Sequence, residues 1–150
     1  MTAHEVAEYL PVSEADYFDD IVRAWKLPVE AARAKVERDF AAIREHGAQT
    51  DDETVFVVER ASDGAPVGMV WLACEEQDGQ RTAFIYDIRI EPAHRRSGFG
   101  RATLDAVEAW GRERGAERVG LHVFGDNAGA RALYAEAGFI ETSIRMIKVL

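Results

Sequence analysis

Residues 95–101, a segment rich in arginine and glycine, form the part of the sequence best suited to binding an anion. The segment reads Arg-Arg-Ser-Gly-Phe-Gly-Arg and stands between an expected strand that ends at Glu91 and an expected helix that begins near Gly98. Gly98 and Gly100 carry no Cβ that would keep a phosphate from the backbone, and the first N–H groups of a helix attract negative charge. The segment therefore predicts a pyrophosphate site.

Two common nucleotide-binding loops do not fit this segment. It lacks the Gly-Lys-Ser/Thr ending with which a Walker loop holds phosphate and Mg²⁺. It also lacks the third glycine of the dinucleotide fingerprint, because Arg101, Ala102 and Thr103 follow Gly100. A glycine-containing helix start on an arginine-rich surface is the simpler structural alternative.

A second pattern lies in residues 127–139. An asparagine opens a short expected helix, which carries Tyr134 and stops at Gly138 before an aromatic residue. Taken alone, Tyr134 beside Leu133 and Ala137 would be interpreted as a core aromatic on an amphipathic helix. Its chemical interest depends on the pattern around it.

Together the two patterns resemble the signatures of the GNAT superfamily of N-acetyltransferases, the first of which reads Q/R-x-x-G-x-G/A after the fourth strand. The matching residues of the first signature are Arg95, Gly98 and Gly100, and those of the second are Asn127, Ala130, Tyr134, Gly138 and Phe139. The resemblance covers residues 85–150 well and the N-terminal part only through the order of its elements.

The resemblance implies transfer of an acetyl group from acetyl-CoA to a primary amine of a small molecule or peptide by direct attack. It implies that the fourth and fifth strands separate and that the pantetheine arm pairs with the backbone of Ile88, Arg89 and Ile90. The oxygen of the thioester would be stabilised by a backbone N–H near Ile90.

The same resemblance implies a role for each matching residue. The pyrophosphate would be held by Arg95, Arg96, Ser97, Gly98, Phe99, Gly100 and Arg101. Tyr134 would contact coenzyme A and protonate the departing thiolate, and Asn127 would contact the pantetheine arm or a bound water. A non-catalytic acetyl-CoA-binding sensor or interaction domain is the alternative.

Three residues are candidates for the general base that accepts the proton of the amine. Asp87 and His122 are preferred equally, and Glu91 follows. Relatives that modify protein N-termini carry an acidic residue at the position that His122 resembles, so this sequence departs from them there. Each candidate also has an ordinary interpretation, as a paired carboxylate, a solvated strand end or an outward-facing polar residue.

Charge is distributed unevenly along the chain. The net charge of −9 argues against nucleic-acid binding, which depends on basic side chains. Residues 1–54 hold thirteen acids and six bases, whereas residues 89–101 hold four arginines and a single acid. The resemblance puts an acceptor opening near Asp16, Asp19, Asp20 and Trp25, where acidic charge would favour a cationic amine. Acidic helices that serve solubility are the alternative.

The expected fold is α/β, with a mixed, largely antiparallel six- or seven-stranded sheet flanked by about four helices. Hydrophobic spacing predicts helices over 13–28, 29–46, 98–114 and 127–137. It predicts strands over 5–10, 54–59, 67–75, 81–91, 118–124 and 139–150, the best part of the last being Ile144–Val149. A polar turn is expected over 49–53.

Several broader properties follow from length and composition. The chain of 150 residues fits one domain, 1–150, and no stretch is apolar enough for a membrane span. The single Cys74 lies in an apolar run and is expected to be buried, and the four histidines show no metal-ligand spacing. No signal sequence is recognised, so the cytoplasm is expected. The final strand is also compatible with edge pairing in a homodimer.

Overall fold

The computed structural model describes residues 1–46 and 52–150 and begins with one long helix, α1 (Ala3–Trp25). The prediction of a strand over 5–10 is therefore wrong. Thr2 and Glu5 form a capping box, in which each side chain bonds the backbone N–H of the other residue. This cap starts the helix, and burial of its inner face carries it through Pro11.

In the described part of the chain four strands form the sheet, in the order β1-β2-β3-β4. They are β1 (Glu53–Glu59), β2 (Pro66–Gln77), β3 (Gln80–Ile90) and β4 (Arg118–Leu121). The first three are antiparallel neighbours, and β4 runs parallel to β3 after a crossover through a helix. The predicted mixed, largely antiparallel character is confirmed.

The predicted six or seven strands are not found, because both terminal candidates are something else. The first is part of α1, and residues 139–150, including Ile144–Val149, form no ladder with any described strand. A strand needs a partner for its backbone N–H and C=O groups. The last residues have alternating strand-like sequence but lie extended and exposed, so the hydrophobic pattern alone did not decide their state.

The longer helices, α1, α2 (Val29–Asp39), α4 (Phe99–Glu113) and α5 (Ala128–Glu136), agree with the expected number of about four. The six-residue α3 (Ala41–His46) and a 3₁₀ turn, η1 (Pro92–His94), which leads into α4, are short additional elements. The predicted helix over 29–46 is divided at Phe40, and most of the expected polar turn over 49–53 lies outside the described residues.

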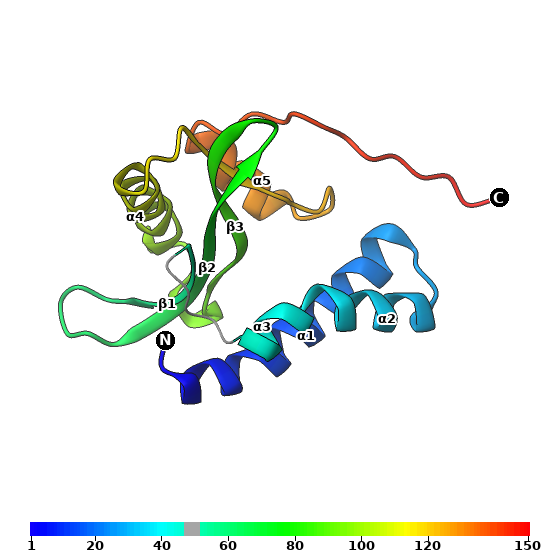
Figure 1. Cartoon of the computed structure of the whole chain (residues 1–150), viewed down its shortest axis with the longest axis horizontal. Coiled ribbons are helices and arrows are strands. Elements are labelled where there is room, and N and C mark those ends of the chain that lie inside the picture. Colours follow the sequence, from blue (N-terminus) through cyan, green and yellow to red (C-terminus); the bar gives the residue numbers. More distant parts are fainter. Residues whose placement is uncertain (47–51) are drawn as a thin grey trace.

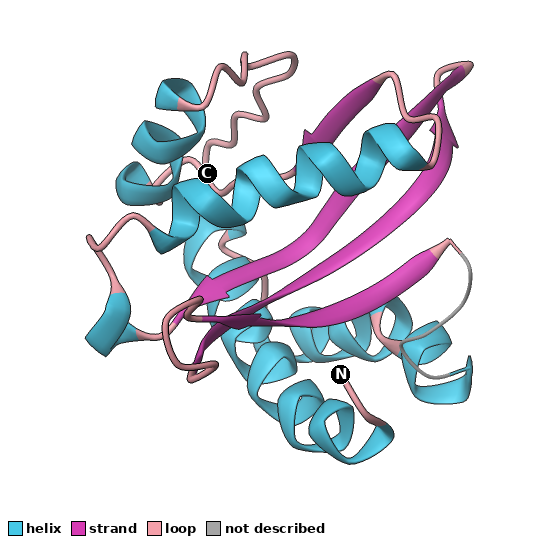
Figure 2. Cartoon of the chain, turned by 90° about the vertical axis from the view of Figure 1, so that its left-hand side faces the viewer, coloured by secondary structure: helices cyan, strands magenta, loops and turns pink. Residues whose placement is uncertain are grey.

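The helices cover opposite faces of the sheet, with α1 to α3 on one side and α4 and α5 on the other (Figures 1 and 2). Two hydrophobic clusters reflect this arrangement. On the α1 side the buried residues include Ile21, Phe40 and Trp71, and on the α4 side they include Leu72 and Leu104. The protein is therefore a three-layer structure in which the sheet separates two cores.

Three further expectations concern Cys74, membrane-spanning helices and metal-binding clusters. Cys74 is buried as predicted, and burial raises the pKa of its thiol. Within residues 1–46 and 52–150 no helix is both long and apolar enough to cross a membrane. No cluster of three or more His, Cys, Asp or Glu side chains suited to a metal ion is found in the same part of the chain.

Candidate functional site

The strands β3 and β4 pair over only four residues and then separate. Their last paired residues are Ile85 and Leu121, while β3 continues to Ile90. On its other side β3 stays paired with β2, and the register between them shifts at Tyr86, which forms a bulge. Residues 86–90 thus present one backbone edge that no described strand covers, the separation that the family resemblance implied for the pantetheine arm.

The segment 95–101 leads from this open edge into the N-terminus of α4. The guanidinium of Arg95 donates from Nε to the carbonyl oxygen of Ile90 at 2.9 Å, which ties the segment to the end of β3. Gly98 is the N-cap of α4 and has φ 83°, a left-handed conformation that favours glycine. Arg96 also has a positive φ of 60°. The chain therefore makes a tight, conformationally specified turn.

Donor groups are available at this helix end. No side chain caps α4, and its first intrahelical backbone bond runs from the N–H of Ala102 to the carbonyl of Gly98. The N–H groups of Phe99, Gly100 and Arg101 therefore precede the helical ladder and carry the positive end of the helix dipole. An exposed turn with such donors and several arginines fits a diphosphate.

Gly100 also has a packing role that the sequence did not indicate. A Cβ at this position would lie 3.0 Å from Cδ2 of Leu133 on α5, so the missing side chain permits close helix packing. At Gly98 a Cβ would meet nothing within 4 Å. The two glycines therefore have different structural roles: Gly98 permits the conformation of the turn, and Gly100 permits close packing of α4 and α5.

Asn127 caps α5 by accepting at Oδ1 a hydrogen bond of 3.1 Å from the N–H of Ala130. The helix ends near Gly138, which has φ 93°. This cap accounts structurally for an asparagine at that position and fixes the direction in which the helix leaves the end of the loop after β4. The amide nitrogen of Asn127 has no hydrogen-bond partner among the described residues and is thus available for a ligand.

Tyr134 lies on the inner face of α5 with 9% of its surface exposed and packs against Phe139. No hydrogen-bond partner of its hydroxyl occurs among the residues that the structure describes. Burial, and then the negative charge of Asp87, raise the pKa of Tyr134 to about 12. The phenol is therefore held protonated and has a free donor.

Asp87 is held by the first helix. The hydroxyl of Tyr9 and the hydroxyl of Ser13 each donate to Oδ2 of Asp87 at 2.8 Å. Burial and the same carboxylate raise the pKa of Tyr9 well above its usual range, so this donor keeps its proton. One carboxylate oxygen is thus anchored by two neutral donors, at the point where β3 has left β4.

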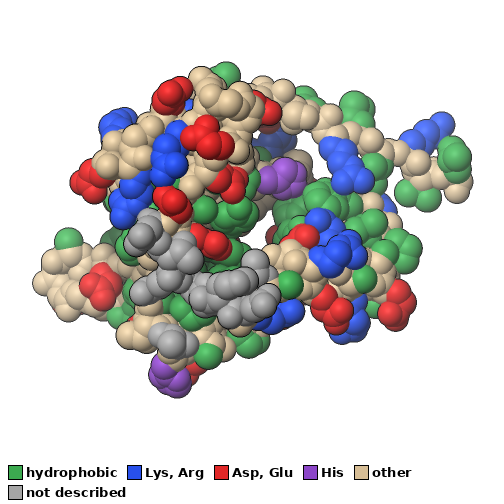
Figure 3. All heavy atoms as spheres, viewed as in Figure 1, with side chains coloured by type: hydrophobic (Ala, Val, Ile, Leu, Met, Phe, Trp, Pro, Cys, Tyr) green, Lys and Arg blue, Asp and Glu red, His purple; other side chains and the backbone are tan. Residues whose placement is uncertain are grey.

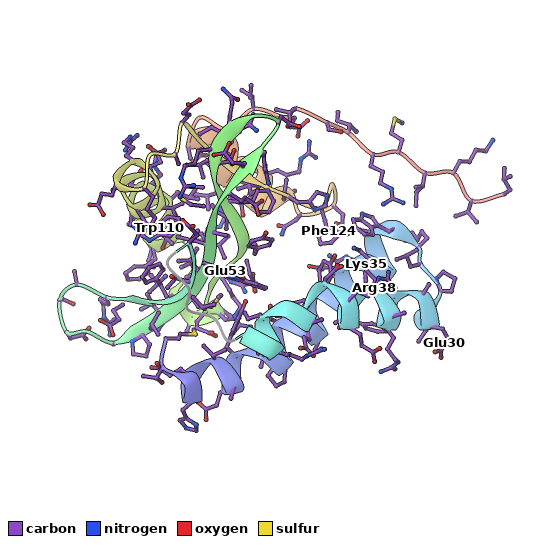
Figure 4. The ribbon with its side chains drawn as sticks, in the orientation of Figure 1. Glu30, Lys35, Arg38, Glu53, Trp110 and Phe124 are labelled. Carbon is purple, nitrogen blue, oxygen red and sulfur yellow. The ribbon has the colours of Figure 1, made fainter. Side chains whose placement is uncertain are left out.

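His122 follows β4 and packs in a different environment. Its ring makes edge contacts with Trp25 and Phe124 at centroid distances of 5.9 and 5.4 Å. Burial, and then the positive charges of Lys35 and Arg145, lower the pKa of His122. Figure 4 shows Lys35 and Phe124 close together on this side of the molecule, far from Trp110 on α4.

The third candidate base, Glu91, is exposed and lies 3.7 Å from Nε of Arg89. The acids expected at the acceptor opening are also partly engaged. Asp16 pairs with Arg89 at 3.3 Å, and Asp20 pairs with Arg23. The charge available to an acceptor on α1 is consequently smaller than the count of acidic residues suggested.

A hollow of about 1370 Å³ lies between β4, α5 and the end of α1. Tyr134, His122 and Trp25 all line it, together with β4 and residues 140–145. Figure 3 shows the hollow beneath the C-terminal segment where that segment projects from the body. Tyr134 is therefore reachable from the side on which α1 and the loop after β4 lie.

Sequence reasoning missed the contribution of α1. Tyr9 and Ser13 were not considered as site residues, because Tyr9 was predicted to lie in a strand. The spacing of Thr2 and Glu5 is that of a capping box, and Val6, Tyr9 and Ser13 recur at helical intervals. These two signals would have extended the helix to the N-terminus and put both hydroxyls on its inner face.

Comparison with known proteins gives an independent view of the chain. Residues 15–139 match the family model described as the acetyltransferase (GNAT) family. The protein named uncharacterized N-acetyltransferase YycN, from Bacillus subtilis, is 29% identical over 150 residues, which cover all of this chain and 96% of that one. Its crystal structure superposes with a TM-score of 0.89 and 95% of that chain covered.

Two further matches are more distant. The mycothiol acetyltransferase of Beutenbergia cavernae is 33% identical over 120 residues, which cover 71% of this chain but only 39% of that longer enzyme. The aminoglycoside N-acetyltransferase AAC(6')-Iy, solved in complex with CoA, is 18% identical with a TM-score of 0.61, covering 88% of this chain and 94% of that one. At that identity it supports the fold alone.

Proposed function

The chain belongs to the acetyltransferase (GNAT) family, with acetyl-CoA as co-substrate, and we propose that it acetylates a primary amine of a small molecule or peptide by direct attack. The proposal is carried by the links among three features: Arg95 ties the turn before α4 to Ile90 at the unpaired edge of β3, Gly100 of α4 packs against α5, and the charge of Asp87 on β3 acts on Tyr134 of α5. Acetyl-CoA supplies the activated acetyl group as a thioester. The protein has to bind it, orient the amine and move two protons.

Binding of the donor uses backbone groups in two places. The edge of Ile88, Arg89 and Ile90 offers N–H and C=O groups to the amides of the pantetheine arm, as an added strand would. The turn over 95–101 offers the free N–H groups of α4 and the charges of Arg95, Arg96 and Arg101 to the pyrophosphate. Asn127, at the start of α5, offers its amide nitrogen, which has no partner among the described residues.

Tyr134 is the proton donor to the departing thiolate in this proposal. The sulfur becomes more basic as the carbon–sulfur bond breaks, so Tyr134 donates its proton to the sulfur at that stage and the free thiol leaves. The proton stays on Tyr134 until that moment because burial and the charge of Asp87 disfavour the phenolate. The free hydroxyl is an observation that a purely structural tyrosine does not require.

Asp87 is the general base in this proposal, with His122 as the competing candidate. The carboxylate of Asp87 is near enough to Tyr134 to raise its pKa, and one of its oxygens is anchored by Tyr9 and Ser13. His122 instead is surrounded by aromatic rings and by two cations. The base and the acid thus flank the same open strand edge, one from each face of the sheet.

The acceptor enters, in this proposal, from the side of α1 and the loop after β4. Aromatic rings of Trp25, Phe124 and His122 offer an apolar wall there.

The preference for a cationic amine rests on the acidic N-terminal third, and its test is the salt dependence of kcat/KM for the amine. We expect kcat/KM for the amine to fall as the salt concentration rises. An increase would indicate an anionic acceptor. The proposed site of action is the cytoplasm.

The test of the proposed function is a direct assay. The protein is incubated with acetyl-CoA and a panel of amines, amino acids, polyamines, aminoglycosides and short peptides. Release of free thiol and the gain of one acetyl group in the product are followed together, the second by mass spectrometry. Thiol release that depends on an amine is expected. Tight acetyl-CoA binding with no amine-dependent release by any member of the panel would favour the sensor alternative.

A further inference from the structure

Tyr86 is unusually exposed for a large aromatic residue inside a sheet, with 46% of its surface accessible. Its ring lies against two others: the centroid of the Trp71 ring is 5.0 Å away and that of the Phe84 ring is 5.1 Å away. Trp71 belongs to the α1-side core, so the three rings form one aromatic surface on that face of β2 and β3. Such a surface, left open to solvent, is a candidate for ligand binding.

The aromatic surface is open because the helices on its side of the sheet lie elsewhere. Figure 1 shows α1 to α3 toward the end of β2 and β3 that is away from the turn joining these two strands. Phe84 also lines the hollow of about 1370 Å³ that Tyr134 and Trp25 line. The aromatic surface is therefore continuous with the side from which the acceptor is proposed to enter.

Two polar tips of the aromatic surface each donate to a carboxylate. The hydroxyl of Tyr86 donates to Oε2 of Glu75 at 2.8 Å, and the indole N–H of Trp71 donates to Oε1 of Glu53 at 2.9 Å. Burial, then the hydrogen bond and charge of Glu75, and then the charge of Glu53 raise the pKa of Tyr86 well above its usual range. The exposed ring therefore lies in a negative electrostatic potential.

The charge of Glu75 is not balanced by a cation among the described residues. Its side chain accepts from two neutral groups, the hydroxyl of Tyr86 and the side-chain amide of Gln77. Arg81, which follows Gln80 at the start of β3, instead pairs with Asp52 at 2.7 Å. Glu75 is thus able to form an ion pair with a cation that a ligand supplies.

The bulge at Tyr86 connects the aromatic surface with the proposed general base. Tyr86 contacts the α1-side core, and Asp87, the next residue, accepts from hydroxyls of α1, so both side chains lie on the α1 side of β3. Glu53 is paired with Ala73 and Ala73 with Phe84. Glu53 is therefore level with a residue three positions before Asp87, a distance of about 10 Å along the strand.

Resting on the proposed function, we propose that the acceptor is a linear diamine or polyamine, whose reacting amine meets Asp87 and whose second ammonium lies over the ring of Tyr86, between Glu75 and Glu53. An ammonium is attracted to an aromatic face, and the two carboxylates add to this attraction. An extended chain advances about 1.2 Å per bond, so a span of about 10 Å needs roughly eight or nine bonds. The reacting amine gives its proton to Asp87, while the second amine keeps its own.

The test compares two acceptors of equal length, 1,8-diaminooctane and octylamine, of which only the first carries a second ammonium. We expect kcat/KM of the native protein to be about tenfold higher for the diamine, the size of effect that one partly exposed cation–π contact with carboxylates gives. The ratio should fall to about threefold or less in Glu75→Gln and in Tyr86→Leu. The shorter 1,3-diaminopropane cannot reach both places and should have no such advantage over propylamine.

Glu76→Gln is the matched control, because it removes the same charge from the next residue of β2, which is exposed and points to the other face of the sheet. This variant should keep the native ratio. Equal kcat/KM of the native protein for 1,8-diaminooctane and octylamine would overturn the proposal. An advantage of the diamine that Glu75→Gln leaves intact, or that Glu76→Gln reduces equally, would also overturn it.

Equilibrium binding separates this inference from the proposed function. Each amine is titrated into the native protein and into Glu75→Gln in the presence of free CoA, and the heat is measured by calorimetry. The dissociation constant of the diamine should be about tenfold lower than that of octylamine in the native protein, and the difference should shrink in the variant. Such binding without acetylation of any amine would contradict the proposed function alone. Acetylation of both amines with equal dissociation constants would contradict this inference alone.

Discussion

The two faces of the sheet are built in different ways around the same open strand edge. On the α4 side, the proposed anion-binding turn and the helix with Tyr134 are short runs of neighbouring residues, 95–101 and 127–139. On the α1 side, Asp87 meets Tyr9 and Ser13, which are 78 and 74 positions away in the chain. The proposed donor site thus uses local backbone conformation, whereas the proposed base depends on the docking of a distant helix.

Because the two sides are built differently, substitutions on each side should affect a different half of the reaction. A local backbone motif keeps its geometry as long as its own turn and cap are intact. A carboxylate oriented by hydroxyls from another element loses its orientation when that element shifts or loses a donor. Substitutions on the α4 side should therefore change acetyl-CoA binding or leaving-group protonation, and those on the α1 side should change proton removal.

The largest expected effect is that of Tyr134→Phe. It removes a hydroxyl without a partner from a buried ring, so the fold should be retained while kcat falls on the order of 100-fold, a typical loss for a general acid. The KM for acetyl-CoA should change little. Steady-state kinetics with a saturating amine provide the measurement.

Tyr17→Phe is the control for this variant, because Tyr17 lies on α1 and donates to Asp39 instead. It should keep kcat within about twofold, and an unchanged kcat in Tyr134→Phe would remove the proton-donor assignment. The pH dependence adds a second check. Because the pKa of Tyr134 is raised to about 12, ionisation of this phenol should cause no loss of native activity up to about pH 10.

The second effect separates the two candidate bases. Asp87→Asn should lower kcat/KM several tens of times, since the amide accepts no proton. His122→Gln should leave the shape of the pH profile of kcat/KM unchanged. If His122 were the base, activity would fall as pH drops through its lowered pKa, below 6.5, and His122→Gln would abolish that dependence. Two native-like profiles would indicate a base reached through water.

The third effect concerns the anion-binding turn. Gly98→Ala forces a side chain into a backbone with φ 83°, so the turn should relax and raise the KM for acetyl-CoA roughly five- to tenfold. Gly64→Ala is a matched control, because Gly64 has φ 74°, lies in the turn between β1 and β2, and has equally open surroundings. Both variants should lose about 1 kcal/mol of stability. Equal KM values in the two would contradict the proposed pyrophosphate site.

The smallest effect tests the start of α1. Thr2→Ala removes one half of the capping box and should lower the free energy of unfolding by about 1 kcal/mol, as measured in urea. Glu8→Ala, which loses only a contact with exposed His4, should change it by less than about half of that. A Thr2→Ala protein as stable as the native one would show that α1 is held by its packing alone.

Sequence reasoning recovered the parts of the fold that have strong local signals. The four paired strands and the helices α4 and α5 agree with their predicted ranges to within a few residues, except that β4 ends at Leu121 and not at 124. Glycine stops and alternating hydrophobicity are sufficient there because they act over a few residues. The splitting of the helix over 29–46 at Phe40 had no comparable local signal.

The terminal segments could not be predicted in the same way. Pro11 suggested a strand followed by a break, but the capping box and burial of one face outweigh the missing N–H of that residue. Ile144–Val149 has a strand pattern, yet a strand exists only when another strand pairs with it. That partner belongs to tertiary or quaternary structure and is invisible in the local sequence.

The family, the donor and the proposed anion-binding turn could be inferred from the sequence alone, because they depend on residue types at short spacing and on backbone conformations that Gly98 and Asn127 specify locally. Three contacts became visible only in the folded chain: Asp87 is anchored by Tyr9 and Ser13, His122 lies among rings and cations, and Gly100 packs against Leu133. Contacts across tens of residues arise from the packing of whole elements, which the hydrophobic pattern of each element does not specify.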